Sequence, residues 1–106
     1  ARHPQVSIVM ALNDPAAMGA LAALQNANRI GTVKVYGVDG VPETKEMILQ
    51  GHMTATAEQS PRQIGKQAAE QAYRLLAGES VPRVIQLPTQ LLTREVLPVS
   101  GKEGWN

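Results

Sequence analysis

The sequence contains no cysteine and no phenylalanine, and its aromatic residues are two tyrosines and one tryptophan. The lack of cysteine excludes disulfide bonds, thiolate metal sites and cysteine nucleophiles, although it does not indicate a cellular compartment. So few aromatic rings cannot form an extended stacking surface for sugars or bases. The net charge is only +1, and no run of lysine and arginine exceeds two residues. This charge distribution argues against a nucleic-acid-binding surface or a basic membrane-surface helix.

The chain also lacks an apolar run of about 18 residues, the length that a membrane-spanning helix needs. Its 106 residues are enough for one domain with a modest core, and its 43% apolar content argues against disorder. The sequence begins at Ala1 without an initiator methionine or a signal-peptide pattern. We therefore expect it to be a piece of a longer protein.

Short apolar runs alternate with helical patterns along the chain. The run Val6–Leu12 is almost continuously apolar, which predicts a strand that is buried on both faces. Further strands are expected in 32–40 and 52–59, and two short strands in 83–97, interrupted by Pro88. The tail from residue 98 has no periodicity. Helices are expected in 14–27, 41–51 and 61–77.

Capping residues mark the predicted helix ends. Asp14 precedes Pro15, which predicts that Asp14 is the N-cap of the first helix, and Ser60 precedes Pro61 in the same way. Asn28 and Gly51 follow the first two helices, where a left-handed residue often ends a helix. Three strand–helix alternations predict the α/β class, with parallel βαβ units and helices packed on a parallel sheet.

Polar side chains follow the three predicted strands. They are Asn13, Asp39 and Gln59. Ligands of open parallel sheets bind at the carboxyl ends of the strands, so we expect these residues to lie on one edge. If Asp14 caps the helix, Asn13 remains free to face a ligand. Asn and Gln both donate and accept hydrogen bonds and Asp accepts them, which suits the hydroxyls of a neutral polyol better than a phosphate.

These residues also have structural and catalytic interpretations. Asn and Asp are common in turns, so each of the three residues has an ordinary turn role as its alternative. Asp14 and Asp39 would be an acid–base pair for glycoside cleavage, but capping already explains Asp14. The sequence has no phosphate-binding loop, dinucleotide fingerprint, zinc-binding HExxH or nucleophile elbow. We therefore predict a binding protein that is not an enzyme and has no cofactor or metal.

The chain resembles the C-terminal part of the periplasmic sugar-binding proteins of ABC transporters, of the ribose-binding type. Three sequence elements carry the resemblance: "ALNDPAAMGALAALQNA", "VKVYGVDGVPETKEMILQGHMTATAEQSPRQIGKQAAEQAYRLLAGE" and the strand-like end. In this family the Asn, Asp and Gln of these elements contact the sugar, and they fall on Asn13, Asp39 and Gln59. The resemblance implies the type I periplasmic-binding-protein fold, a monosaccharide ligand, a periplasmic location and an ABC transporter membrane component as partner.

The resemblance also implies a two-lobe parent protein of which this chain is about the last third. Residues 1–59 would belong to one sugar-binding lobe. Residues 60–106 would form a hinge crossover, a long helix and strands that return to the other lobe. The rings that stack on the sugar, and further Arg and Asp ligands, would come from the remainder of the parent chain, which is therefore an expected partner.

A second family shares this half of the fold. The effector-binding cores of LacI-type transcription repressors are similar to it, and the ending "TREVLP" is compatible with them. The long match over "MILQGHMTATAEQSPRQIG" favours the transport receptors, a function that involves no nucleic acid. A secretory signal peptide or a helix-turn-helix upstream would distinguish the two.

Overall fold

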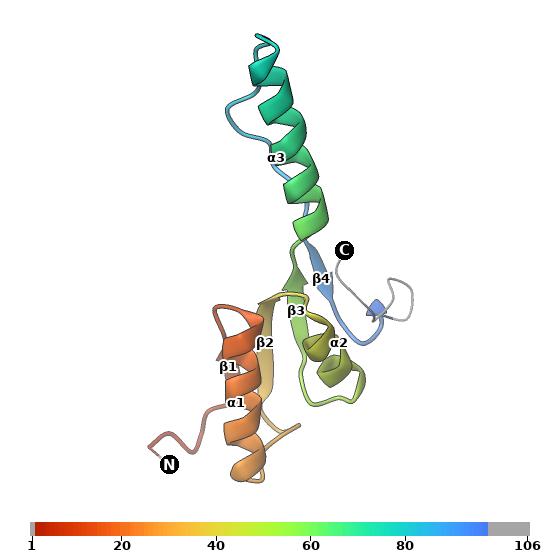
Figure 1. The fold of residues 1–106 in the computed structure, drawn as a ribbon. Helices are drawn as coiled ribbons and strands as arrows, with labels where there is room; N and C mark the ends of the chain where they lie inside the picture. The colour runs from red at the N-terminus through yellow and green to blue at the C-terminus, as the bar shows by residue number, and fades with distance from the viewer. Residues whose placement is uncertain (1, 98–106) are drawn as a thin grey trace.

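A four-stranded mixed sheet is the centre of the fold in the computed structural model, which describes residues 2–97 (Figure 1). The strands are β1 (Ile8–Met10), β2 (Lys34–Asp39), β3 (Ala55–Glu58) and β4 (Gln90–Leu92), and they lie side by side in the order β1-β2-β3-β4. The first three strands are parallel, as the alternation of strands and helices predicts. The last strand runs antiparallel to β3, with Glu58 opposite Gln90.

Three helices follow the first three strands. They are α1 (Asp14–Asn26), α2 (Pro42–Leu49) and α3 (Pro61–Leu76). Each has a proline in its first turn, where the missing N–H costs no intrahelical bond. Asn28, just past the end of α1, has φ +57°, and Gly51, just past α2, has φ +82°. The left-handed helix ends predicted from these two residues are confirmed.

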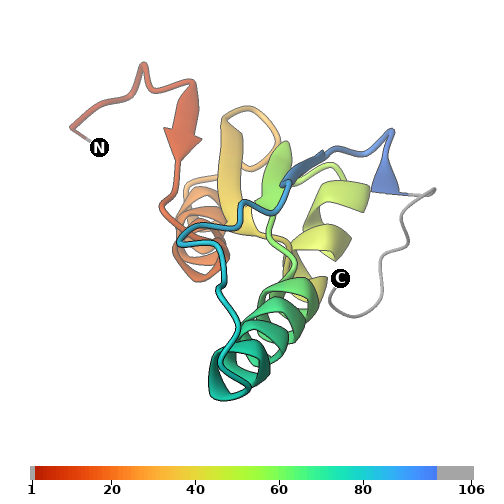
Figure 2. The same ribbon diagram turned by 90° about the horizontal axis from the view of Figure 1, so that it is seen from above.

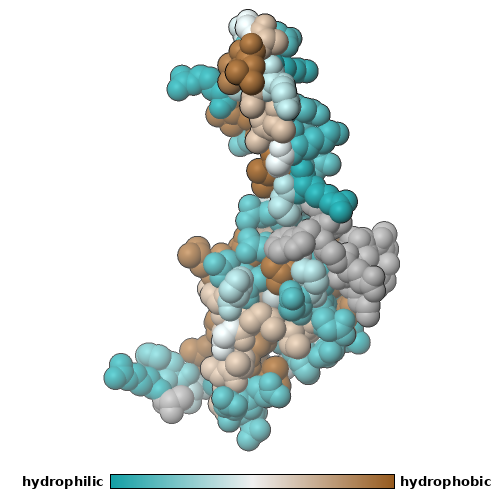
Figure 3. Space-filling view, viewed as in Figure 1, coloured by the Kyte–Doolittle hydropathy of each residue, from teal (hydrophilic) through white to brown (hydrophobic). Residues whose placement is uncertain are grey.

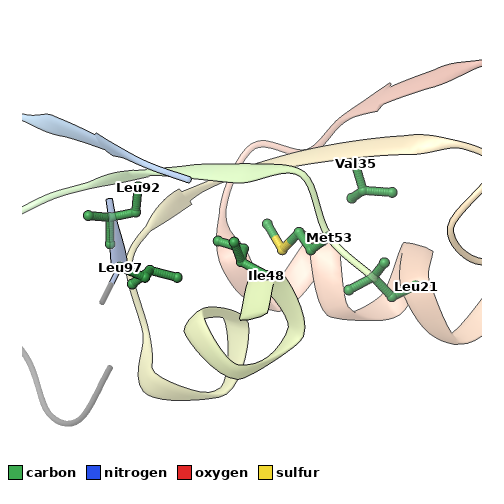
Figure 4. Packing of buried hydrophobic residues seen from close by; sticks show 7 residues of the cluster. Leu21, Val35, Ile48, Met53, Leu92 and Leu97 are labelled. Atoms are coloured by element: carbon green, nitrogen blue, oxygen red, sulfur yellow. The ribbon is translucent and has the colours of Figure 1, made fainter. Parts of the chain in front are cut away.

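The core lies between the sheet and the two helices α1 and α2, which cover the same face (Figure 2). α1 packs against β2, and α2 packs against β3. Figure 4 shows the side chains that fill the layer. They are Ala17, Leu21, Val35, Ile48, Met53, Leu92 and Leu97. Burial of one large aliphatic side chain contributes roughly 1.5–3 kcal/mol, so this small cluster accounts for much of the stability of the layer.

The opposite face of the sheet has no helix on it among the described residues (Figure 2). Ile8 is 54% exposed and Met10 is 80% exposed, whereas Val9 between them packs against the core. Leu91, on the other edge strand, is also exposed. The prediction that the first strand is buried on both faces is therefore wrong for this chain, because nothing in residues 2–97 covers the outer face.

The helix α3 projects away from the sheet, and the chain runs back beside it to β4 (Figure 1). None of its residues is buried, and Ile64 and Leu76 are among its exposed apolar side chains. Figure 3 shows this apolar side of α3 next to a hydrophilic one. The radius of gyration is 17.5 Å, whereas about 13 Å is usual for a compact chain of this length. The elongated shape results from this projecting helix.

Residues 83–87 form no strand, although the apolar pattern predicts one there. Because a strand needs a hydrogen-bonded neighbour, an apolar segment beside a lone helix remains irregular. The second of the two short strands predicted in 83–97 is present as β4. No helix in the described part of the chain has both the length and the apolar content to cross a membrane.

Candidate ligand-binding site

Asp39 and Gln59 are joined at the carboxyl ends of β2 and β3. The Gln59 Nε2 amide donates to Asp39 Oδ1 at 2.9 Å, and the Gln59 backbone N–H donates to the Asp39 carbonyl at 3.0 Å. Asp39 is half-buried and Gln59 is exposed. Parallel pairing of β2 with β3 aligns Asp39 with Glu58, the residue before Gln59. Two of the three predicted site residues are thus in direct contact.

The backbone of Asp39 has an unusual conformation. Its φ of +130° lies in a region that residues with a Cβ seldom adopt, and the next residue, Gly40, has φ +84°. Such a conformation costs about 1–3 kcal/mol and persists where the surroundings impose it. A Cβ on Gly40 would lie 2.9 Å from Glu58 Cγ, so the turn passes too close to β3 for any larger residue.

Asn13 has a structural role that the sequence analysis assigned to Asp14. It is the N-cap of α1, and its Oδ1 accepts the Ala16 backbone N–H at 2.9 Å. The prediction that Asp14 caps this helix and leaves Asn13 free of a local role is therefore wrong. Because the cap uses only the carbonyl oxygen, the Nδ2 amide of Asn13 makes no hydrogen bond within residues 2–97 and can still donate to a ligand.

Asp14 is fully buried and links four segments. Its Oδ2 accepts the backbone N–H groups of Gly40 and Val41, at 2.8 and 2.9 Å, and the Thr44 hydroxyl at 2.6 Å. Its Oδ1 accepts the Thr56 hydroxyl of β3 at 2.7 Å. Bonds to a charged acceptor are among the strongest in proteins, so this carboxylate ties α1 to the β2–α2 turn and to β3. The Asp14–Gly40 bond also places Asn13 at the same edge as Asp39.

Space for the Asp14 carboxylate comes from Gly37 in the middle of β2. A Cβ there would lie 2.9 Å from Met53 Cε and 3.3 Å from Ala17 Cβ, and it would overlap the carboxylate. Glycine weakens a strand interior, and such positions often mark a close approach. The close approach here is between β2 and the start of α1.

A buried ion pair lies beside the carboxyl edge of the sheet. Lys45 Nζ in α2 is 3.2 Å from Glu58 Oε1 at the end of β3, and both side chains are almost fully buried. Loss of one partner from such a pair leaves an uncompensated charge and is strongly destabilising. The pair therefore fixes α2 to the last residue of β3, immediately before Gln59.

A cavity of about 590 Å³ lies where the chain leaves the sheet after β3 and re-enters it before β4. Its lining comes from both segments and includes Glu58, Ser60, Leu87 and Pro88. The segments around Gln59 and Pro88, at the two ends of the crossover, therefore lie side by side. Across residues 2–97 no group of histidine and carboxylate side chains is arranged to hold a metal ion.

Asp14, Thr44 and Thr56 form a connected buried set that is not predicted from the sequence above. A signal for them was present, because Asn13 and Asp14 are adjacent residues of the capping type and only one residue can be the N-cap. The other, in the first turn, needs a different partner if it is buried. Thr56 in a buried strand is a hydroxyl that also needs one. Asn13, Asp39 and Gln59 lie at the edge of the sheet next to this buried set, and their side chains carry carboxylate and amide groups that can accept and donate hydrogen bonds.

Comparison with known proteins shows the family of the chain. A family model described as "Periplasmic binding protein domain" matches residues 1–80. The ribose import binding protein of Escherichia coli (strain K12) is 39% identical over 93 residues, which cover 88% of this chain and 31% of that protein. The lactose operon repressor of Klebsiella pneumoniae is more weakly similar, at 32% identity over 102 residues, which cover 95% of this chain and 28% of the repressor.

A solved structure shares the fold closely. The ABC transporter periplasmic solute-binding protein of Actinobacillus succinogenes 130z, determined with bound D-allose, superposes with a TM-score of 0.89 at 31% identity. The alignment covers 92% of this chain and 35% of that one. The chain thus spans about a third of the length of the relatives that it matches. From the family match over most of its residues and the shared fold, the chain belongs to the periplasmic binding protein family.

Proposed function

We propose that the protein to which this chain belongs binds a small monosaccharide without changing it chemically, as the receptor of an ABC-type sugar importer in the periplasm. Asn13, Asp39 and Gln59 are the ligand-binding residues of this chain in the proposal. The observation that carries it is the hydrogen bond between Asp39 and Gln59 at the carboxyl edge of the sheet. The similarity to proteins named for ribose import and crystallised with D-allose supports the choice of ligand class.

The hydrogen-bonding groups left at this edge match a pair of sugar hydroxyls. Within residues 2–97, Asp39 Oδ2 makes no hydrogen bond, and Gln59 uses one N–H of its side chain. Asp39 can therefore accept from one hydroxyl while Gln59 donates to or accepts from the next. Asn13 adds a donor from the start of α1. No lysine or arginine is among the three, which favours a neutral ligand over a phosphate.

The mechanism that we propose is closure of two lobes on the sugar. Residues 1–59 belong to one lobe, and the crossover after Gln59 leads to the other, with a second crossover near Pro88. The lack of buried residues on α3 supports this assignment, because a helix that packs on another lobe is exposed when that lobe is absent. The strands after α3 are expected to return to the other lobe, but β4 pairs with β3, which supports a return of the chain to the first lobe instead. A closed form of this kind is what the membrane component of the transporter would recognise.

The alternative function is the effector-binding core of a LacI-type repressor. The lactose operon repressor of Klebsiella pneumoniae matches 95% of the chain, which favours this candidate over other functions of the fold. The ribose import proteins match at higher identity, which supports the transport receptor as the main proposal. The residues that precede Ala1 in the full-length protein distinguish the two.

A thermal-shift screen of the full-length protein against pentoses and hexoses tests the proposal. We expect one sugar, or a few related ones, to raise the melting temperature, since a ligand that binds only the folded state stabilises it. Small-angle scattering of the free and sugar-bound protein should then show a decrease in the radius of gyration on binding. The proposal fails if no monosaccharide shifts the melting temperature.

A further inference from the structure

Asp14 does not face the proposed ligand edge, yet its contacts converge on that edge. The side chain is fully buried, and all four of its hydrogen bonds are made inside the protein. Three of them reach Oδ2 from Gly40 and Val41, in the turn that directly follows Asp39, and from Thr44 in the first turn of α2. The fourth reaches Oδ1 from Thr56 in β3. The two oxygens therefore have different tasks, one holding the turn and the other holding the sheet.

The turn that Oδ2 holds would not keep its conformation by local preference. Asp39 has φ +130° and Gly40 has φ +84°, so two consecutive residues have positive φ. The backbone N–H groups of Gly40 and Val41 both point to Asp14 Oδ2. Without that acceptor they would be buried or half-buried donors with no partner, and the turn would rearrange to satisfy them.

Asp14 is also the first residue of α1, so it follows directly after the cap residue Asn13. A shift of its side chain would move the start of the helix that carries Asn13 and would release the turn that carries Asp39. We infer that Asp14 is a positioning residue for the ligand edge: its buried carboxylate sets the relative placement of Asn13 and Asp39. This inference rests on the proposed sugar-binding function.

The test compares Asp14→Ala, Asp14→Asn and Leu21→Ala in the full-length protein by titration with D-ribose and D-allose. Asp14→Ala removes the acceptor and should lower affinity by about tenfold or more. Asp14→Asn should restore most of the affinity, because its amide oxygen can face Gly40 and Val41 while its NH₂ group donates to the Thr56 hydroxyl. Leu21→Ala, in the core two turns along α1, is the matched control, and it should lower stability without changing affinity.

A second measurement does not need a sugar. In Asp14→Asn, amide hydrogen exchange at Gly40 and Val41 should become about tenfold faster, because a bond to a carboxylate is replaced by a weaker bond to an amide. Exchange at Val35, near the start of β2, should not change. This measurement also serves if Asp14→Ala does not fold.

The outcomes distinguish the positioning role of Asp14 from the proposed sugar-binding function. Wild-type affinity in Asp14→Ala, or an affinity loss in Leu21→Ala as large as in Asp14→Ala, overturns the positioning role. Unchanged exchange at Gly40 and Val41 in Asp14→Asn overturns it as well. If the wild-type protein binds neither sugar, the choice of these ligands is wrong, and the exchange measurement alone decides the role of Asp14.

Discussion

Asp39 presents the only carboxylate among the three proposed ligand residues, and we expect it to contribute most to binding. In the full-length protein, Asp39→Ala should weaken sugar affinity by about 2–4 kcal/mol, because charge-assisted bonds are lost and sugar hydroxyls remain unpaired. Gln59→Ala should cost roughly 1–3 kcal/mol. Isothermal titration calorimetry measures both losses. Asp39→Asn is the control, since it keeps an acceptor for Gln59 and tolerates a positive φ. Unchanged affinity in Asp39→Ala would show that the site is elsewhere.

Asn13 combines a capping role with a proposed ligand role, and two substitutions separate them. Asn13→Ala removes both, so it should lower the free energy of unfolding by about 1 kcal/mol and sugar affinity by roughly 1–3 kcal/mol. Asn13→Asp keeps the cap acceptor but lacks the amide donor. Its stability in denaturant titrations should equal that of the wild type, while its affinity falls. An Asn13→Asp protein that binds sugar normally would restrict Asn13 to capping.

The turn between β2 and α2 is tightly constrained, because Asp39 and Gly40 both have positive φ and Gly40 lies close to Glu58. Gly40→Ala would add a Cβ 2.9 Å from Glu58 Cγ and 3.2 Å from Glu58 Cα, at a φ of +84°. We expect a loss of about 1–3 kcal/mol in stability, measured by urea denaturation. Gly19→Ala is the matched control, because it lies in α1 with nothing within 4 Å, and it should stabilise by about 0.5–1 kcal/mol. Equal stabilities of the two variants would mean that the turn adapts easily.

The order and type of these elements could be predicted because their signals are local. Pro15, Pro42 and Pro61 mark the helix starts, and Asn28 and Gly51 adopt the left-handed ends that their residue types favour. The carboxyl edge of the sheet then follows from the parallel alternation. These predictions needed no knowledge of distant contacts.

Predictions that depend on distant partners were less successful. The prediction that Asp14 is the cap is wrong because the actual partners of Asp14 are 26 to 42 residues away in the chain, and no spacing rule indicates them. The first strand was expected to be buried on both faces, and 83–87 was expected to be a strand. Both expectations assumed neighbours that residues 2–97 do not supply. The sugar-binding role of Asn13, Asp39 and Gln59 remains a prediction.

The outer face of the sheet and one side of α3 carry apolar side chains that nothing in residues 2–97 buries. Their exposed side chains include Ile8, Met10, Ile64 and Leu76. Uncovered strand edges and apolar patches promote association. We therefore expect the isolated 106-residue chain to associate with itself or with the remainder of its parent chain, and to bind sugar poorly. Light scattering and calorimetry on the isolated chain test this. A stable monomer with micromolar sugar affinity would contradict the lobe assignment.

The central claim is that the edge formed by Asn13, Asp39 and Gln59 contacts a monosaccharide. A crystal structure of the full-length protein with the best sugar from the thermal-shift screen tests it most directly. The account predicts sugar hydroxyls within about 2.5–3.2 Å of the Asp39 carboxylate, the Gln59 side chain and the Asn13 amide. It also predicts that Asp14 is buried behind the turn without touching the sugar. A sugar bound between the lobes without contact to Asp39 or Gln59 would contradict the account.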